Sequence, residues 1–197
     1  MLISDPPETP GARAMYEAAR REDGYVPNHD RLWSWRPAVN KAFLVTRRRL
    51  SDVSPLSMRE RAVIVCATAR RRDDAYCALA WGSRLAELAS PDIAGALLAT
   101  GDVSALSSRE KALAAWAEKV ASAPTSTQAS DIAALKAAGL SDQEIFDATL
   151  FIAFRLAFCT VNDALGAAPD RQLSDAAPSA VREAVTYGRR AAESLSR

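Results

Sequence analysis

The sequence is poor in the residues that build metal sites and disulfide frameworks. Its only histidine is His29, which excludes a multi-histidine metal site within one chain. The three cysteines, Cys66, Cys77 and Cys159, are odd in number and widely spaced, unlike the disulfide pattern of a secreted domain. There are 8 glycines and many alanines, which favours helix over sheet. We therefore predict an all-α protein without a metal site.

A strong charge of either sign is also missing. The 25 basic and 24 acidic residues leave a net charge of +1, too small to attract nucleic acid or an anionic membrane. The arginine triplets at 47–49 and 70–72 have acidic neighbours, which favours solvated helix ends over phosphate contacts. The most apolar stretch, 148–158, is too short to span a bilayer and contains Arg155. No basic-then-apolar leader opens the sequence, so we expect a cytoplasmic protein.

What the sequence does contain is a series of helical segments. Its 197 residues are 49% hydrophobic, enough for one domain with a full core, and no segment has a convincing strand period. Ser-x-x-Glu capping boxes predict helix starts at Ser57, Ser107 and Ser141. The longest predicted helix covers 142–165 and should run through the core. We expect the other helices at 11–22, 32–35, 37–49, 92–98, 128–138 and 178–194.

The stretch 56–89 reads as two helices joined by a short charged turn. Residues 62–69 have no polar face beyond Thr68, which predicts a helix buried nearly all round. Asp73 or Asp74 can cap the next helix. On that helix Asp74, Cys77 and Trp81 fall at i, i+3 and i+7, so they share one stripe. A thiol between a carboxylate and an indole marks a candidate site.

This stretch resembles the core of the carboxymuconolactone decarboxylase and alkylhydroperoxidase D (AhpD) superfamily, in particular its peroxidase-related branch. The resemblance rests on R-E-R-A at 59–62 and D-A-Y-C-A-L-A-W-G at 74–82, and it extends over 24–170. It implies an AhpD-like orthogonal helical bundle that forms a homo-oligomer, as a dimer or a trimer of dimers. It also divides the chain into an arm and helix (1–23), the helical domain (24–170) and a C-terminal helix (171–197).

The departures from the family fall on its redox chemistry. Ala62 stands at the family's proton-relay glutamate, Asp74 at its first cysteine and Trp81 at its histidine, so only Cys77 remains of the relay. We therefore predict that the thiol-peroxidase machinery has been lost. Cys77 could equally be a small core residue.

A second polar stripe lies on the long helix. Arg155, Cys159 and Asn162 fall at i, i+4 and i+7 among phenylalanines. A guanidinium there needs a partner, because an unpaired buried charge is unfavourable by several kcal/mol. That partner is either a structural carboxylate, such as Glu60, Asp74 or Asp163, or a carboxylate on a ligand.

These observations lead to a functional prediction with two alternatives. We expect a small-molecule enzyme that performs cofactor-independent acid–base chemistry (decarboxylation, isomerisation or ring opening) on a small carboxylate-bearing substrate. The alternatives are a catalytically silent binding or assembly protein and a residual one-cysteine peroxidase. Asp74 and Glu60 could also be simple capping residues, and His29 reads as a surface or capping side chain beside Asp30. The predicted catalytic residues are Asp74, Cys77 and Glu60, and the predicted substrate-binding residues are Trp81, Arg155, Cys159, Asn162 and Tyr76.

Overall fold

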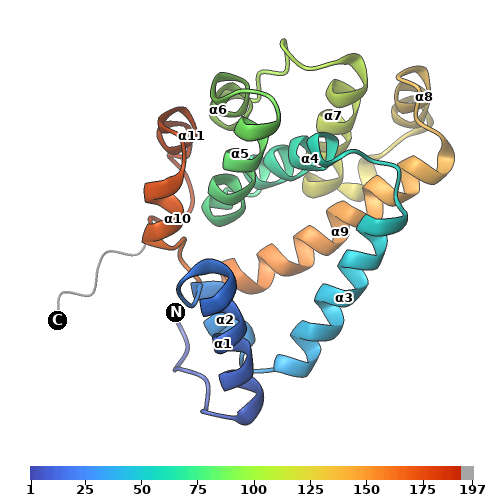
Figure 1. Cartoon of the computed structure of the whole chain (residues 1–197). Coiled ribbons are helices and arrows are strands. Elements are labelled where there is room, and N and C mark those ends of the chain that lie inside the picture. Colours follow the sequence, from blue (N-terminus) through green and yellow to red (C-terminus); the bar gives the residue numbers. More distant parts are fainter. Residues whose placement is uncertain (192–197) are drawn as a thin grey trace.

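The computed structural model describes residues 1–191, and this part of the chain contains helices and no strand. The all-α prediction is confirmed. Residues 1–191 form eleven α-helices and one short 3-10 helix (Figure 1). Their bounds are α1 Pro10–Asp23, α2 Asn28–Trp33, α3 Pro37–Val53, α4 Met58–Arg71, α5 Ala75–Leu88, α6 Pro91–Thr100, α7 Ser108–Ser122, η1 Pro124–Ser126, α8 Ala129–Ala137, α9 Asp142–Leu165, α10 Arg171–Ala176 and α11 Ser179–Ala184.

The helix starts follow from local chemistry. Ser57, Ser107 and Ser141 each accept a hydrogen bond from the backbone N–H three residues on, and the glutamate at that position accepts one from the serine N–H. All three predicted capping boxes are confirmed. Gly101 and Gly166 end α6 and α9 in the left-handed conformation, where a side chain would be strained.

Helix α4 is the centre of the core. Every residue from 62 to 69 is buried, as the apolar run predicts, and Thr68 satisfies its hydroxyl by donating to the carbonyl of Ile64. α4 packs against α5 and α7 most extensively, and also against α6 and α9. α5, α6 and α11 meet closely, since a Cβ on Gly82 would lie 2.6 Å from Leu98 Cδ1 and 2.7 Å from Val181 Cγ1.

Helix α9 runs diagonally through the molecule and joins the core to the N-terminal helices. In Figure 1 it passes behind α3, with α1 and α2 at its C-terminal end. α2 and α3 both contact α9, whereas α1 packs on α2 and α3. The N-terminal helices therefore cover one side of α9, and α4 and α5 lie on the other side.

The C-terminal part differs from the prediction. The single helix expected over 178–194 is instead α11, which ends at Ala184, and α10 precedes it where a loop was expected. Two β-branched residues, Val185 and Thr186, follow α11, and Gly188 then adopts a φ of 69°. This turn packs on the start of α5, because a Cβ on Gly188 would lie 2.9 Å from the Ala75 nitrogen. Residues 192–194 of the expected helix lie outside the described residues.

Two other boundaries moved. α2 begins at Asn28 rather than at 32, and α3 continues to Val53 rather than ending at 49. Within residues 1–191, no helix combines the length and apolar character that a membrane crossing requires.

Candidate functional site

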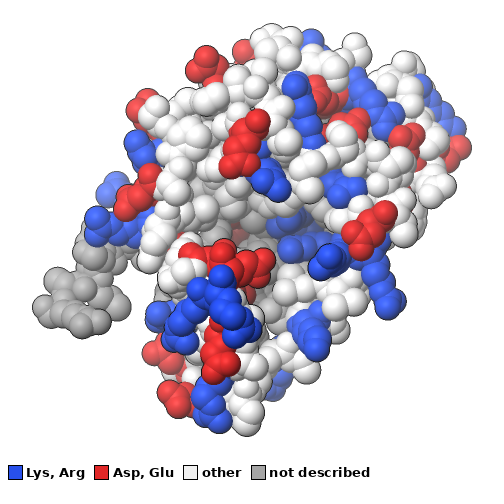
Figure 2. Space-filling view, viewed as in Figure 1, with Lys and Arg blue, Asp and Glu red and all other residues white. Residues whose placement is uncertain are grey.

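A cavity of about 360 Å³ lies where α5 and α9 face the N-terminal helices. In Figure 2 a hollow separates the α1–α2 segment, at the lower centre, from the rest of the molecule. The cavity brings together residues that are far apart in the sequence. Its lining residues are Glu22, Asp23, His29, Asp30, Asn40, Leu44, Arg47, Tyr76, Cys77, Ala80, Trp81, Arg155 and Phe158.

The two predicted polar stripes meet behind this cavity. Asp74 is the N-cap of α5 and accepts a hydrogen bond from the Cys77 backbone N–H on Oδ1, at 3.0 Å. The sulfur of Cys77 lies 3.2 Å from the sulfur of Cys159 on α9. The other Asp74 oxygen, Oδ2, is buried without a hydrogen-bond partner among the described residues. One carboxylate and two thiols therefore form a buried cluster, and within it only Cys77 lines the cavity.

This cluster has the donor types of a metal site but the spacing of two touching thiols. One ligand atom each from Asp74, Cys77 and Cys159 lies within 4.8 Å of the others. Two thiolates on a tetrahedral zinc ion would stand about 3.8 Å apart, given Zn–S bonds of about 2.3 Å. The observed 3.2 Å is shorter and fits a direct sulfur–sulfur contact. Contact with Cys77 and burial raise the pKa of the Cys159 thiol well above its ordinary value, so this group is protonated at neutral pH.

Two arginines line the cavity, and neither has a carboxylate partner in residues 1–191. Arg155 is 6% exposed, and its guanidinium carbon lies 4.5 Å from the ring centroid of Trp81. Its Nε has no hydrogen-bond acceptor in residues 1–191. Arg47, on α3, reaches the same cavity. Burial lowers the pKa of Arg47 to about 10, and the positive charge of Arg155 contributes to that shift. Within the described residues, neither guanidinium has a carboxylate oxygen within 4.0 Å.

Aromatic side chains form a second wall. The ring of His29 stacks on Tyr76 with centroids 5.2 Å apart and meets Phe158 edge-on at 5.5 Å. His29 Nδ1 lies 3.2 Å from Asp30 Oδ1. The sequence suggested a surface or capping role beside Asp30, and the structure places this half-buried imidazole on the cavity wall instead.

Asp170 holds this wall in place. Its Oδ2 accepts a hydrogen bond from the Tyr76 hydroxyl, and its Oδ1 accepts one from the Asn28 backbone N–H at 2.8 Å. Burial, followed by the charge of Asp170, raises the pKa of Tyr76 well above its ordinary value. The Tyr76 hydroxyl is thus committed to Asp170, and Tyr76 contributes its ring to the cavity.

The rim of the cavity is acidic on the side of α1 and α2. Glu22, Asp23 and Asp30 lie there, and Figure 2 shows acidic side chains over that segment beside the hollow, facing basic ones. Burial raises the pKa of Asp23, and the neighbouring charges of Glu22 and Asp30 raise it further. These carboxylates stand beyond ion-pair distance from Arg47 and Arg155.

Two predicted residues lie elsewhere. Asn162 accepts a hydrogen bond on Oδ1 from Trp33 Nε1 at 2.9 Å, so it anchors α2 to α9 and does not line the cavity. Glu60 completes the capping box of α4 and pairs with Arg109 at 2.5 Å. Its carboxylate therefore belongs to the ion-pair network at the helix starts and does not line the cavity.

Sequence reasoning missed Arg47 and His29 as site residues. The arginine triplet at 47–49 was interpreted as a solvated helix end. This interpretation was wrong for Arg47, which lines the cavity, while the other two arginines do not. A usable signal was present, because Asn40, Leu44 and Arg47 fall at i, i+4 and i+7 and all line it. No comparable local signal exists for His29, whose position depends on the contact between α2 and α5.

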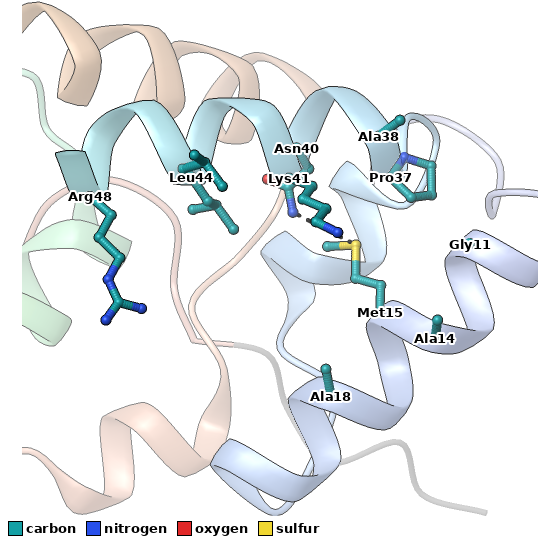
Figure 3. A pocket seen from close by; sticks show the side chains of 11 residues that line it. Gly11, Ala14, Met15, Ala18, Pro37, Ala38, Asn40, Lys41, Leu44 and Arg48 are labelled. Atoms are coloured by element: carbon teal, nitrogen blue, oxygen red, sulfur yellow. Dashed lines mark hydrogen bonds between the residues drawn. The ribbon is translucent and has the colours of Figure 1, made fainter.

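A larger hollow of about 660 Å³ lies between α1 and α3 (Figure 3). Its walls are mostly apolar and include Met15, Pro37 and Leu44, and it contains neither thiol. Figure 3 shows Met15 of α1 pointing toward Asn40 of α3, where the amide nitrogen lies 3.7 Å from the sulfur. This groove lacks the reactive groups of the cavity.

Solved structures identify the fold. A crystal structure from Ralstonia eutropha JMP134, described as an alkylhydroperoxidase AhpD core of an uncharacterized peroxidase-related protein, matches with a TM-score of 0.75. It is 24% identical and covers 85% of this chain and 91% of its own. The fold is AhpD-like.

A second structure gives the same result. An uncharacterized peroxidase-related protein from Silicibacter sp. TM1040 matches with a TM-score of 0.78 and 22% identity, covering 87% of this chain and 93% of its own. No family model and no curated protein sequence matches the chain. The AhpD-like fold expected from the 59–62 and 74–82 motifs is therefore confirmed, while the chemistry must be argued from the cavity itself.

Proposed function

We propose that the cavity binds a small carboxylate-bearing molecule and that the protein is an enzyme acting on it. One observation carries this proposal. Arg47 and Arg155 converge on one cavity, and neither has a carboxylate partner in the described part of the chain. In contrast, Arg59, Arg70 and Arg109 each pair with a glutamate.

The energetics favour an anionic ligand. A buried guanidinium without a partner loses hydration that the protein does not replace, and the face of Trp81 offsets only part of that loss. A second positive charge nearby makes the empty cavity less favourable still, and burial first and the charge of Arg155 second lower the pKa of Arg47. A carboxylate between the two arginines would relieve both effects through charge-assisted hydrogen bonds.

Proton exchange is the chemistry that the remaining wall supports. Beside the carboxylates of the rim, Cys77 and His29 are lining side chains that can give and take a proton, whereas the Tyr76 hydroxyl is held by Asp170. Asp74 accepts a hydrogen bond from the Cys77 backbone N–H and does not line the cavity. It therefore acts through Cys77 rather than directly on the ligand. These groups fit decarboxylation, isomerisation or ring opening of a carboxylate-bearing substrate without a cofactor.

Calorimetry tests the binding half of the proposal. Wild-type protein should bind a small dicarboxylate such as succinate and not its neutral analogue succinamide. Arg155→Met should weaken binding about 100-fold and Arg47→Met about 10-fold, since Arg155 is the more buried cation. Arg49→Met is the matched control because Arg49 is exposed on the same helix as Arg47 and lines neither the cavity nor the groove between α1 and α3. Failure of every tested carboxylate to bind, or equal binding by Arg155→Met, would overturn the proposal.

Deuterium exchange tests the catalytic half. In heavy water, a panel of keto acids and lactone acids should show incorporation of deuterium or loss of carbon dioxide, followed by nuclear magnetic resonance. Cys77→Ser and His29→Gln should slow that exchange while carboxylate affinity stays near wild type. Binding without any exchange would instead favour the silent binding protein.

We also propose that the protein is a homo-oligomer, built through the groove between α1 and α3. Two apolar side chains of α3 that line this groove are exposed, Leu44 at 37% and Val45 at 44%. Light scattering should give a mass above one 21.2 kDa chain, and Val45→Glu should reduce it to that value.

A further inference from the structure

We propose that Cys77 and Cys159 form a reversible disulfide, and that the cavity is a site of thiol–disulfide exchange with small disulfides bearing a carboxylate. The thiol pair rests on the contact between α5 and α9. The preference for a carboxylate rests on the proposed function of Arg47 and Arg155.

The geometry of the pair supports bond formation. The sulfurs are 3.2 Å apart, so closing to a disulfide bond of about 2.05 Å requires an approach of about 1.1 Å. Side-chain rotation on two helices can supply most of that movement. The two residues are 82 positions apart in the chain, so the bond would join the first turn of α5 to the last third of α9.

Access makes the two thiols unequal. Cys77 lines the cavity, whereas Cys159 does not and is reached from the cavity through Cys77. Cys77 is therefore the sulfur that a small disulfide meets first. Cys159 is the resolving sulfur, held in its thiol form by burial and by Cys77. The buried Oδ2 of Asp74, which has no partner in residues 1–191, is placed to accept the proton that Cys159 releases.

The reaction proceeds in two balanced steps. The Cys77 sulfur attacks one sulfur of the small disulfide, the bond between its two sulfurs breaks, and one small thiol leaves with the Cys77 proton. The Cys159 sulfur then attacks the Cys77 sulfur, and the second small thiol leaves with the proton from Cys159, passed through Asp74. Two protein thiols are oxidised and one small disulfide is reduced to two thiols. An external dithiol restores the protein by the reverse exchange.

The third cysteine is an internal control. Cys66 lies on α4 with 0% exposure, and burial raises its pKa well above the ordinary value. It lies outside the cavity, so neither step reaches it. Cys66→Ala should therefore behave like wild type in every exchange measurement.

Two matched reagents test the proposal. Dithiodipropionate and cystamine have the same carbon spacing around the disulfide, but the first ends in carboxylates and the second in ammonium groups. Reduced full-length protein is treated with each, alkylated, digested and mapped by mass spectrometry. Wild type and Cys66→Ala should give a Cys77–Cys159 linkage that dithiothreitol removes. Cys159→Ser should stop at a mixed disulfide on Cys77, and Cys77→Ser should leave Cys159 unmodified.

Thermal unfolding gives a second readout. The linkage closes a loop of about 80 residues, so it should raise the unfolding midpoint by about 10 °C. Absence of the linkage in wild type with both reagents, or linkage of Cys66 instead, would overturn the thiol pair. Circular dichroism of each variant separates a lost reaction from a lost fold.

The rates separate this inference from the proposed function. Dithiodipropionate should react at least about 10-fold faster than cystamine, and Arg155→Met should remove that difference. Equal rates with both reagents would leave the thiol pair standing and overturn the carboxylate preference. Carboxylate binding without any Cys77–Cys159 linkage would overturn the thiol pair and leave the proposed function standing.

Discussion

The arginines at the starts of α4 and α7 differ from those in the cavity beside α5. The first have carboxylate partners, and within residues 1–191 the second have none. At the helix starts, Arg59 pairs with Glu110 at 2.6 Å, and Arg109 pairs with Glu60 at 2.5 Å and also with Glu144. Each capping-box glutamate thereby neutralises an arginine of the facing helix. In the cavity, Arg155 is more buried than either of these arginines and has no such partner in the described residues.

The difference separates charges that stabilise the fold from charges that serve a ligand. A compensated arginine at a helix start ties two helices together, while its glutamate partner also accepts a hydrogen bond from the N-cap backbone N–H. An uncompensated buried arginine destabilises the empty protein, so its presence needs a role outside folding. Stability measurements on variants of the two regions can therefore support or contradict the assignment of the cavity arginines to ligand binding.

The largest effect is expected from Arg109→Met. This change leaves Glu60 and Glu144, both partly buried, without their shared cation. The free energy of unfolding should fall by about 2 to 3 kcal/mol, measured by urea denaturation. Arg84→Met is the control, because the pair of Arg84 with Glu87 is exposed and its loss should change stability by less than about 0.5 kcal/mol.

Arg155→Met should act in the opposite direction. It removes a buried charge that has no carboxylate partner in the described part of the chain, and it keeps an apolar side chain of similar length against Trp81. The free energy of unfolding of the ligand-free protein should rise by about 1 kcal/mol in the same denaturation assay. A loss as large as that of Arg109→Met would show that Arg155 is structural and would remove the contrast between the two regions.

A smaller effect is expected at Asp163, on α9 near the thiol cluster. Burial and then the charge of Asp74 raise the pKa of Asp163 from 3.8 to about 7, whereas Arg189 and Arg72 lower it. The folded protein therefore holds this proton more tightly than the unfolded chain. Stability is greatest where the group is protonated in both states, below about pH 4, and decreases as the pH rises through about 7.

Asp163→Asn removes this pH dependence. At about pH 8 the variant should be more stable by about 1 kcal/mol, less than the full pKa difference implies because solvent screens the charge of this half-buried group. At about pH 4 the two proteins should have the same unfolding midpoint. A destabilised variant at the higher pH would mean that ionised Asp163 has a stabilising partner.

Much of the fold could be predicted from the sequence because its signals are local. The capping boxes at Ser57, Ser107 and Ser141 and the buried run 62–69 predicted helices that the structure contains. The expected helix over 178–194 was wrong because charged residues at helical spacing concealed two β-branched residues and a glycine in the left-handed conformation. Spacing alone does not report that the chain must turn to pack on α5.

The candidate site was predicted in part. Cys77, Trp81 and Arg155 were expected in one site from two stripes, and they line one cavity. Asp74 and Cys159 join it only through Cys77, and Glu60 belongs to a different network. The residues that were missed, His29 and Arg47, come from the N-terminal helices; the spacing of Asn40, Leu44 and Arg47 marks one face of α3, but it does not show that this face lies opposite α5.

The sequence by itself determined the helical class and most helix boundaries. Hydrogen bonds within a turn and apolar periodicity suffice for these features, because they involve neighbours in the chain. Only the tertiary structure decided that Cys159 touches Cys77 and that Arg47 and Arg155 share one cavity. Contacts between residues 82 positions apart depend on how α9 crosses the core, which is set by packing across the whole molecule.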